Sequence, residues 1–320
     1  PPPAHEEGDG WAHIDRVGGW DALLTEFEAM DEVPAQYSQL FCWAYGEVLR
    51  RLQAAQEEGL ELDRALKWLC FLPQALCRKP RRGGKSGAGL INKRFNCLAI
   101  DKNWGEVVRL WEQDREITRE ERRKKKSERE EEQEERSKEQ ERVHKKRKVM
   151  LLLGKGQVSK AVRIIHSNGV ADIEEPGVKE QLLSKHPPRG MDLPERVPRG
   201  SPVANLKGLK EAMLALRRLG SPGTGGLRPE YLHTLARGME PAQLLLLEDF
   251  GLRYLYGGLP AWFYRVFLTS QTVPLFKTAE KAAVRPIGVR SVLLRLLHKE
   301  VVSQNKEEFV RYLEPQQLGM

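Results

Sequence analysis

The stretch that decides the fold is TVPLFKTAEKAAVRPIGV, residues 272–289. Two short runs rich in β-branched and apolar residues, 272–277 and 284–289, flank six small or polar residues, which predicts a β-hairpin. Lys277 ends the first run and Arg285 begins the second. Strand pairing would bring both cations to one end of the hairpin, where Lys offers a polyphosphate a point charge and Arg a bidentate fork. On these residues alone, ordinary solvated surface cations are the better explanation.

Helical patterns lie on both sides of this hairpin. Upstream, residues 206–219 are amphipathic, the glycine-rich loop SPGTGG follows at 221–226, and Pro229 stands where proline favours the first turn of a helix. The apolar run 244–255 continues as a helix, and residues 291–312 present apolar side chains on one face. We therefore predict an α+β fold that is mostly helical, with one short β-hairpin.

Aromatic residues concentrate just before the hairpin, within residues 262–267. Such rings can stack on nucleic-acid bases. Their position among apolar helix residues favours a role in the core instead, because aromatic side chains dominate core burial.

Apolar residues also recur at helical spacing through the first hundred residues. They follow a three- and four-residue period over 20–30, 40–52 and 62–72, which predicts at least three amphipathic helices. Pro73 is expected to end the third of them. A further short helix is expected to lead through residues 104–111.

Composition divides the chain into four predicted zones. Residues 1–111 are a helical leader region, and residues 112–148 are almost purely charged, without proline or glycine. Opposite charges three and four residues apart support a solvated helical spacer there, while the polar heptad positions argue against a stable coiled coil. Residues 149–204 are a small helical module followed by a linker rich in Pro and Arg, and residues 205–320 are the domain that carries the hairpin.

The chain as a whole is basic. Its 320 residues have a formal net charge of +8, a sequence pI of about 9.3 and a mean hydropathy of −0.55. This balance favours a polyanionic partner, because neutralising phosphates releases condensed counterions. Four scattered cysteines include no CxxC pair, so no zinc site is expected and the predicted environment is reduced and intracellular. No apolar run has the length of a membrane span, so no membrane partner is predicted.

Basic clusters outside the hairpin each allow two explanations. The loop 78–87 contains Gly-Lys-Ser, but Lys79 occupies the first glycine position of a P-loop and no apolar strand precedes it, so an NTPase site is rejected. The loop is either a patch that contacts nucleic-acid phosphates or a mobile surface loop. The cluster at 122–126 is best explained by the charged helix. A better candidate for a nuclear-import signal, which predicts a nuclear location, comprises Lys145, Lys146, Arg147 and Lys148.

Four short motifs occur in the order found in one family of polymerases. SPGTGGL at 221–227 resembles an SPGxDG loop, PLFK at 274–277 a P-x-x-K segment, VRPI at 284–287 an RPI signature, and LEPQQLG at 313–319 an L-x-P-x-Q-x-G segment. Together they resemble the start of the reverse transcriptase domain of non-LTR (LINE-like) retroelements. The sequence departs from the family in the loop, where Gly225 replaces an Asp.

The resemblance implies that residues 205–320 are part of the fingers of a right-hand polymerase, an RNA-directed DNA polymerase that copies retrotransposon RNA into DNA. It assigns the contacts with the phosphates of the incoming nucleotide to Lys277 and Arg285. Residues 72–78 and 104–111 also resemble the leader region of LINE-type polyproteins. The residues expected to shape the glycine loop near the template, or to add positive charge along its path, are Gly223, Gly226, Arg290, Arg295 and Lys299.

The same resemblance places the metal-binding aspartates of the palm after Gly319, so none of them lies in this chain. In the complete enzyme those carboxylates hold two Mg²⁺ ions, and no cofactor is expected for this chain by itself. The chain is expected to be a fragment, inactive alone, whose partners are an RNA template, a DNA primer and a deoxynucleoside triphosphate. The alternative is a non-catalytic, basic nucleic-acid-binding or scaffold protein built on the charged helix, which explains the pI but not the ordered motifs.

Overall fold

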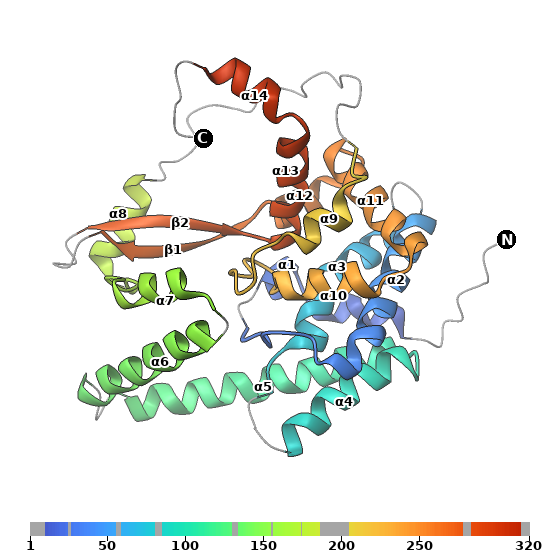
Figure 1. Cartoon of the computed structure of the whole chain (residues 1–320). Helices are drawn as coiled ribbons and strands as arrows, with labels where there is room; N and C mark the ends of the chain where they lie inside the picture. Colours follow the sequence, from blue (N-terminus) through green and yellow to red (C-terminus); the bar gives the residue numbers. More distant parts are fainter. Residues whose placement is uncertain are drawn as a thin grey trace. The chain divides into compact units, whose positions relative to one another are not determined.

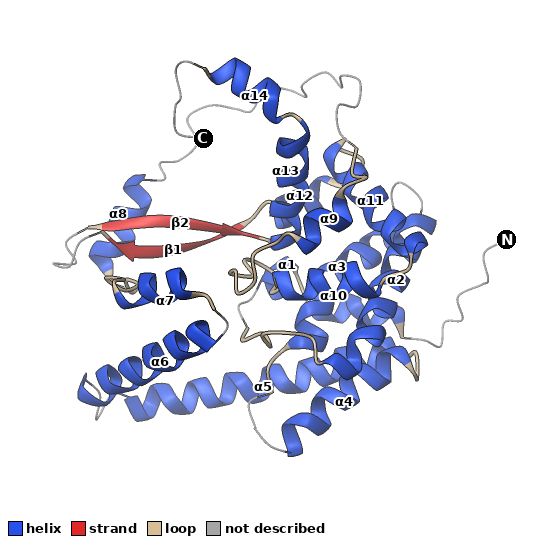
Figure 2. Ribbon diagram, in the orientation of Figure 1, coloured by secondary structure: helices blue, strands red, loops and turns tan. Residues whose placement is uncertain are grey.

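The computed structural model describes residues 10–24, 27–55, 59–80, 85–129, 134–154, 156–173, 175–185, 205–277 and 283–314. It is mostly helical, with one antiparallel sheet of two strands (Figure 1, Figure 2), and this confirms the predicted mostly helical α+β class. None of the helices in these ranges combines the length and apolar character needed to cross a bilayer. In chain order the elements are η1 (Trp11–Val17), α1 (Trp20–Leu24), η2 (Ala35–Tyr37), α2 (Ser38–Ala54), α3 (Leu60–Cys77), α4 (Lys85–Ala99), α5 (Trp104–Arg129), α6 (Glu134–Gly154), α7 (Val158–Ile165), α8 (Pro176–Lys185), α9 (Leu209–Leu214), α10 (Pro229–Gly238), α11 (Pro241–Leu255), α12 (Ala261–Phe267), β1 (Ser270–Phe276), β2 (Val284–Arg290), α13 (Val292–Gln304) and α14 (Lys306–Leu313).

The chain divides into two compact units, and each is described by itself. The larger unit contains the described parts of residues 1–112, 194–271 and 289–320. The smaller unit contains those of residues 113–193 and 272–288. The units therefore do not follow the four zones that composition predicts, because the first of those zones and most of the last belong to the same unit.

Helices α2 and α3 pack side by side in the larger unit. The faces predicted from helical spacing are largely buried, with Val48 on α2 and Leu66 on α3 at 0% exposure. Leu40 and Trp43 of the face predicted for α2 are only half-buried.

The expectation that Pro73 ends the third helix is wrong, since α3 continues to Cys77. Proline costs a helix one hydrogen bond. The last turn is retained here because all its residues after Pro73 are buried, so the helix keeps a large apolar area out of water.

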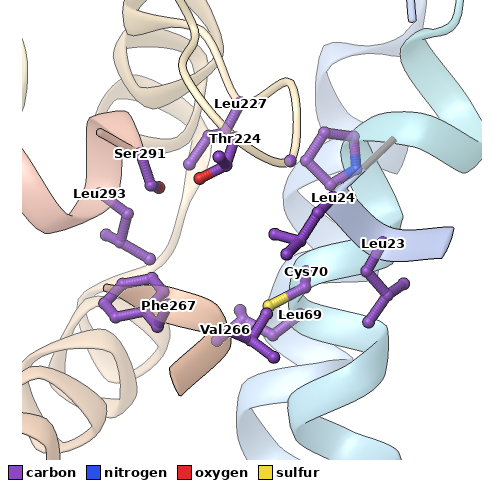
Figure 3. Close-up of a pocket in the computed structure, with 12 residues that line it drawn as sticks. Leu23, Leu24, Leu69, Cys70, Thr224, Leu227, Val266, Phe267, Ser291 and Leu293 are labelled. Atoms are coloured by element: carbon purple, nitrogen blue, oxygen red, sulfur yellow. The ribbon is translucent and has the colours of Figure 1, made fainter. Parts of the chain in front are cut away.

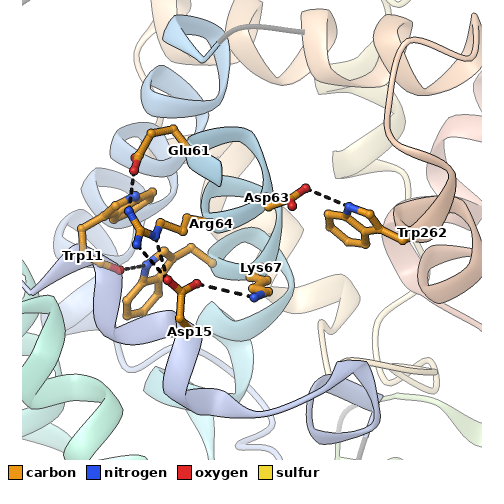
Figure 4. Close-up of polar contacts among 8 residues, drawn as sticks. Trp11, Asp15, Glu61, Asp63, Arg64, Lys67 and Trp262 are labelled. Atoms are coloured by element: carbon orange, nitrogen blue, oxygen red, sulfur yellow. Dashed lines mark hydrogen bonds and ion pairs between the residues drawn. The ribbon is translucent and has the colours of Figure 1, made fainter. Parts of the chain in front are cut away.

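A tryptophan cluster closes one side of this core. The ring centroids of Trp68 and Trp104 are 4.7 Å apart, and those of Trp11 and Trp104 are 4.8 Å apart. The Trp68 indole N–H donates to the Trp11 carbonyl at 3.0 Å, and the Arg51 guanidinium lies 4.2 Å from the centre of the Trp11 ring. Figure 4 shows the polar rim of the cluster, where Asp15 binds two cations of α3. The indoles thus hold η1, α3 and the start of α5 together.

The N-terminal helices share one hydrophobic core with the segments that follow residue 205. The ring of Phe41 packs against that of Tyr231 with centroids 5.8 Å apart. The Tyr231 hydroxyl donates to the Met30 carbonyl, and the Trp262 indole N–H donates to the Asp63 carboxylate at 2.8 Å (Figure 4). The leader region and the segments after residue 205 therefore share one core and do not form two separate ones.

The smaller unit has a limited core of its own. Its buried members are Ala171, Val178, Leu182 and Val284, with Phe276 packed against them. Backbone hydrogen bonds from residues 169–171 pair this segment with β1, at Ala171 N to Pro274 O (2.9 Å) and Phe276 N to Gly169 O (3.3 Å). The edge of β1 that faces away from β2 is thereby partly covered, which protects it from pairing with other chains.

The charged stretch is helical on both sides of residues 130–133, which lie outside the described part. Helix α5 carries the first half as far as Arg129, and α6 resumes at Glu134. The predicted helical spacer is thus found as two helices, and the first of them begins inside the tryptophan cluster.

Two predicted helices are shorter or interrupted. The helix expected over 206–219 is limited to α9, Leu209–Leu214, and Leu219 adopts a left-handed φ of 57° where the chain turns towards the glycine loop. The helix expected over 291–312 is divided into α13 and α14 at Asn305, whose side chain amide donates back to the Val301 carbonyl at 2.8 Å. Asn commonly competes with helical backbone bonding in this way.

Candidate functional site

The β1–β2 ribbon has a single register that positions Lys277 and Arg285. The Lys277 N–H donates to the Ala283 carbonyl at 2.8 Å, and the strand ends agree with this pairing, because Phe276 lies opposite Val284. Lys277 and Arg285 are therefore diagonal neighbours on the same face of the ribbon. The predicted strands are correct to within two residues, although Lys277 follows β1 and is not its last residue. The turn residues 278–282 lie outside the described residues.

The end of the β1–β2 ribbon that carries Lys277 and Arg285 is called the ribbon end, and its two faces differ in burial. Phe276 and Val284 belong to the face that packs on Val178 and Leu182 of α8. Lys277 and Arg285 lie on the opposite face and are exposed. Neither cation has an acidic partner among the residues that the structure describes. The ribbon end thus offers two positive charges that no carboxylate of the described residues neutralises, on strands that the packing of their apolar face holds in position.

In the larger unit, the glycine loop Ser221–Gly226 is tightly constrained by its neighbours. Gly223 and Gly226 have φ values of 69° and 74°, a backbone conformation that residues other than glycine rarely adopt. A Cβ at Gly223 would overlap the Arg290 carbonyl, and one at Gly226 would overlap the Phe27 ring. Glycine is required at both positions by conformation and by space.

Basic residues of β2 and α13 adjoin this loop. The Arg295 guanidinium donates to the Ser221 carbonyl, and the Arg290 carbonyl contacts Gly223. Lys299 lies one turn after Arg295 on α13 and is exposed, as are both arginine side chains. Burial lowers the pKa of His298, and the nearby Arg290 lowers it further. Three of the predicted template residues therefore stand on one helix and the strand end before it, beside the loop.

Two cavities lie against the glycine loop. The smaller, about 40 Å³, is lined mainly by apolar side chains of α1, α3 and α12, with Thr224 and Ser291 at one side (Figure 3). The larger, about 230 Å³, is called here the loop cavity, and its lining comprises Leu24, Phe27, Ser221, Pro222, Gly223, Thr224, Gly225, Gly226 and Gln271. The two share Leu24, Thr224 and Gly225, so the loop forms a wall of both.

Phe27 and Gln271 are residues that the sequence analysis did not assign to a site. Helical spacing places Phe27 on the first predicted helix, but α1 ends at Leu24 and Phe27 precedes an extended segment. That segment is held by a bridge between Ala29 and Arg78 and by the Met30 N–H to Cys77 carbonyl bond of 2.8 Å. The period of three and four residues could not distinguish this segment from one more helical turn.

The other basic and aromatic motifs have clearer outcomes. Arg78 is buried, Lys79 pairs with Glu28 at 2.6 Å, and the loop residues 81–84 lie outside the described residues. Phe263 and Phe267 are buried in the core, which confirms the explanation preferred for the aromatic cluster. On α6, Lys146, Arg147 and Lys148 are exposed, whereas Lys145 donates to the Ile165 carbonyl at 3.2 Å.

The described residues contain no group of three or more His, Cys, Asp or Glu side chains arranged to hold a metal ion. The four cysteines are free, and burial raises the pKa of Cys42 to about 11 and that of Cys77 to about 12. Such thiols are poor metal ligands and nucleophiles, because the thiolate is the reactive form. No protein-family profile matches the chain, and neither a curated protein nor a solved structure resembles it significantly.

Proposed function

We propose that this chain carries the fingers of an RNA-directed DNA polymerase of the non-LTR retroelement class. The observation that carries the proposal is the ribbon end, where Lys277 and Arg285 are exposed diagonal neighbours on one face. These are the two residues to which the sequence resemblance assigns the phosphates of the incoming nucleotide.

The chemistry of the pair suits a triphosphate. Lys277 supplies a compact charge and Arg285 a planar fork that can bind two phosphate oxygens at once. Among the described residues neither cation is paired with a carboxylate, so no ion pair with those residues has to break before a phosphate binds. The packing of Phe276 and Val284 on α8 restrains the strands and so reduces the entropy lost on binding.

For the template, the proposal relies on the glycine loop and the cations beside it. The backbone of Gly223 and Gly226 lines the loop cavity, which is the side from which the template would approach the loop. Arg290, Arg295 and Lys299 add positive charge that attracts phosphates without reading sequence. An RNA template and a DNA primer are the partners that this arrangement suits.

Polymerisation also needs carboxylates that hold two Mg²⁺ ions, which stabilise the attacking and leaving oxygens. In the family that the chain resembles, these aspartates follow the segment that corresponds to residues 313–319. Nucleotide addition is therefore proposed for the protein that includes them, with this chain contributing nucleotide and template contacts.

The test is to extend the chain with the coding sequence that follows Met320 in its source transcript and to assay RNA-templated DNA synthesis. The double variant Lys277→Ala/Arg285→Ala should raise the KM for the nucleotide at least about tenfold, since hydrogen bonds to charged groups contribute about 1.5–3 kcal/mol each. The matched control is Lys210→Ala/Arg237→Ala, which removes two exposed cations from α9 and α10. A frame that closes without metal-binding aspartates, or an unchanged KM, would contradict the proposal.

One observation favours the alternative, a non-catalytic nucleic-acid-binding protein. Between Arg142 and Val170 the sequence contains eight Lys or Arg residues and no Asp or Glu. The exposed cations of α6 would then carry RNA binding, and they also form the basis of the proposed nuclear import. If Lys146→Glu/Arg147→Glu/Lys148→Glu abolishes RNA binding and Lys277→Ala/Arg285→Ala changes no nucleotide affinity, the alternative is the better account.

A further inference from the structure

The loop cavity combines one aromatic wall with several polar groups. Its apolar lining residues are Leu24, Phe27 and Pro222, and the remaining lining residues are Ser221, Thr224, the three glycines of the loop and Gln271. Its volume of about 230 Å³ corresponds to roughly eight water molecules at ~30 Å³ each. That space is large enough for a single nucleobase.

Phe27 is held in place before any ligand arrives. The tip of its ring contacts Gly226, and the Arg78 guanidinium lies 5.8 Å from the ring centre. The backbone that carries it is fixed at Ala29 and Met30 by α3. Because the ring is already ordered, stacking a ligand on it would cost little further entropy.

Gln271 supplies a side chain that can read the edge of such a ligand. Gln271 is half-buried, and its side-chain carboxamide makes no hydrogen bond to any of the described residues. A carboxamide offers a donor and an acceptor side by side, which complements the edge of a nucleobase. By contrast, the Thr224 hydroxyl is already committed to the Thr269 carbonyl at 3.3 Å.

Cations stand beside the same loop. Arg295 binds the loop at Ser221 and Arg290 contacts it at Gly223, and both side chains are exposed. A base in the cavity would thus have a phosphate-binding surface next to it. A single strand can present an unstacked base in this way, whereas in a duplex stacking covers the faces of the bases and pairing occupies their Watson–Crick edges.

We infer that the loop cavity receives one unstacked base of a single-stranded RNA, with Phe27 as the stacking platform and Gln271 at the base edge. The inference rests on the proposed function and extends it, since it assigns template contact to the leader segment around Phe27. It also identifies a position where binding depends on a base and not only on phosphates.

The experiment uses the full chain and a short single-stranded RNA with 4-thiouridine at successive positions. Irradiation should cross-link one position to peptides that contain Phe27 or Gln271. Fluorescence anisotropy should show Phe27→Leu weakening RNA binding about tenfold, within the 1–3 kcal/mol typical of base stacking on an aromatic residue. Phe309→Leu is the matched control, because Phe309 is an exposed residue of α14.

A second set of measurements separates a role of Phe27 in RNA binding from a role in folding. In an RNA that has an abasic site at the cross-linked position, Phe27→Leu and the native protein should bind equally. Gln271→Ala provides a variant whose folding does not depend on the Phe27 contacts, and it should change the preference among bases at that position. Weaker binding that persists with the abasic RNA would overturn the inference.

Two further measurements distinguish a base of RNA from a free nucleotide, and the loop cavity from the nucleotide site proposed at Lys277 and Arg285. If uridine monophosphate displaces the cross-link as well as the RNA does, the cavity binds free nucleotides and the RNA assignment is wrong. The variant Lys277→Ala/Arg285→Ala should leave the cross-link unchanged. A cross-link without any effect of Lys277 and Arg285 on nucleotide binding retains this inference and removes only the nucleotide site.

Discussion

Trp262 donates its indole N–H to the Asp63 carboxylate at 2.8 Å, across 199 positions of sequence (Figure 4). The bond joins α12 to α3, two helices of the larger unit that composition alone places in different zones. It is one of several contacts, with Tyr231 to Met30 and Arg253 to Leu52, that join the leader region to the rest of this unit.

The first prediction concerns this bond. Trp262→Phe keeps an aromatic ring but removes the donor, and it should lower the free energy of unfolding by about 1–2 kcal/mol. Urea denaturation followed by circular dichroism measures the change. Asp63→Asn should cost less in the Trp262→Phe background than in the native chain, and equal costs would show that the two side chains are not coupled.

The second prediction concerns Gly223. Gly223→Ala introduces a Cβ that overlaps the Arg290 carbonyl and also places Ala at a left-handed φ of 69°. Gly257→Ala is the control, because Gly257 has a φ of 74° but open space around it. The control should lose about 1–2 kcal/mol of stability from conformation alone, and Gly223→Ala should lose more. Equal losses in chemical denaturation would mean that the loop can move away from Arg290.

The third prediction is a pH dependence. Burial and Arg290 hold the pKa of His298 below its usual value of 6.5, so the folded chain resists a protonation that the unfolded chain accepts. His298 therefore lowers stability as the pH falls below about 6.5, and the loss is complete once the pH is below the folded pKa. His298→Gln should reduce the stability difference between pH 7 and pH 5 in urea titrations. An unchanged difference would assign the acid sensitivity to other groups, such as the buried His233.

The fourth prediction separates the two units. Leu182 is one of only four buried residues in the core of the smaller unit as described. Leu182→Ala should cost about 2–5 kcal/mol locally. Hydrogen exchange should accelerate in α7 and α8 while α2 and α3 keep their protection. Faster exchange throughout both sets of helices would show that the units unfold together.

The fifth prediction uses the cysteines. Burial raises the pKa of Cys77 to about 12 and leaves its side chain inaccessible, so it should resist iodoacetamide at neutral pH. Mass spectrometry should find it alkylated only after urea is added. Rapid labelling of Cys77 in the native chain would show that the end of α3 opens readily.

The hairpin was predictable because its signals are local. Two runs rich in β-branched and apolar residues flank six small or polar residues, and β1 and β2 begin and end within two residues of these runs. The helices α2 and α3 were predictable for the same reason, since a period of three and four residues reports the buried face directly. The cations of the ribbon end could likewise be identified from their places at the strand ends.

The rest depended on partners that are distant in sequence. Pro73 does not end α3, because burial against the surrounding core outweighs one lost hydrogen bond, and no local pattern reveals that core. Phe27 was assigned to a helix, although it lies in a segment held by Arg78 and the following residues. The loop cavity could not be predicted either, since its walls come from Leu24, Phe27, residues 221–226 and Gln271.

The shared core also bears on how the chain folds while it is being synthesised. Phe41 emerges from the ribosome about 190 residues before its partner Tyr231, which at 5–20 residues per second is a delay of roughly 10–40 s. During that interval the apolar face of α2 has no native partner from the second half of the chain. Nascent chains stalled before residue 231 should therefore bind chaperones, and those released beyond residue 300 should not.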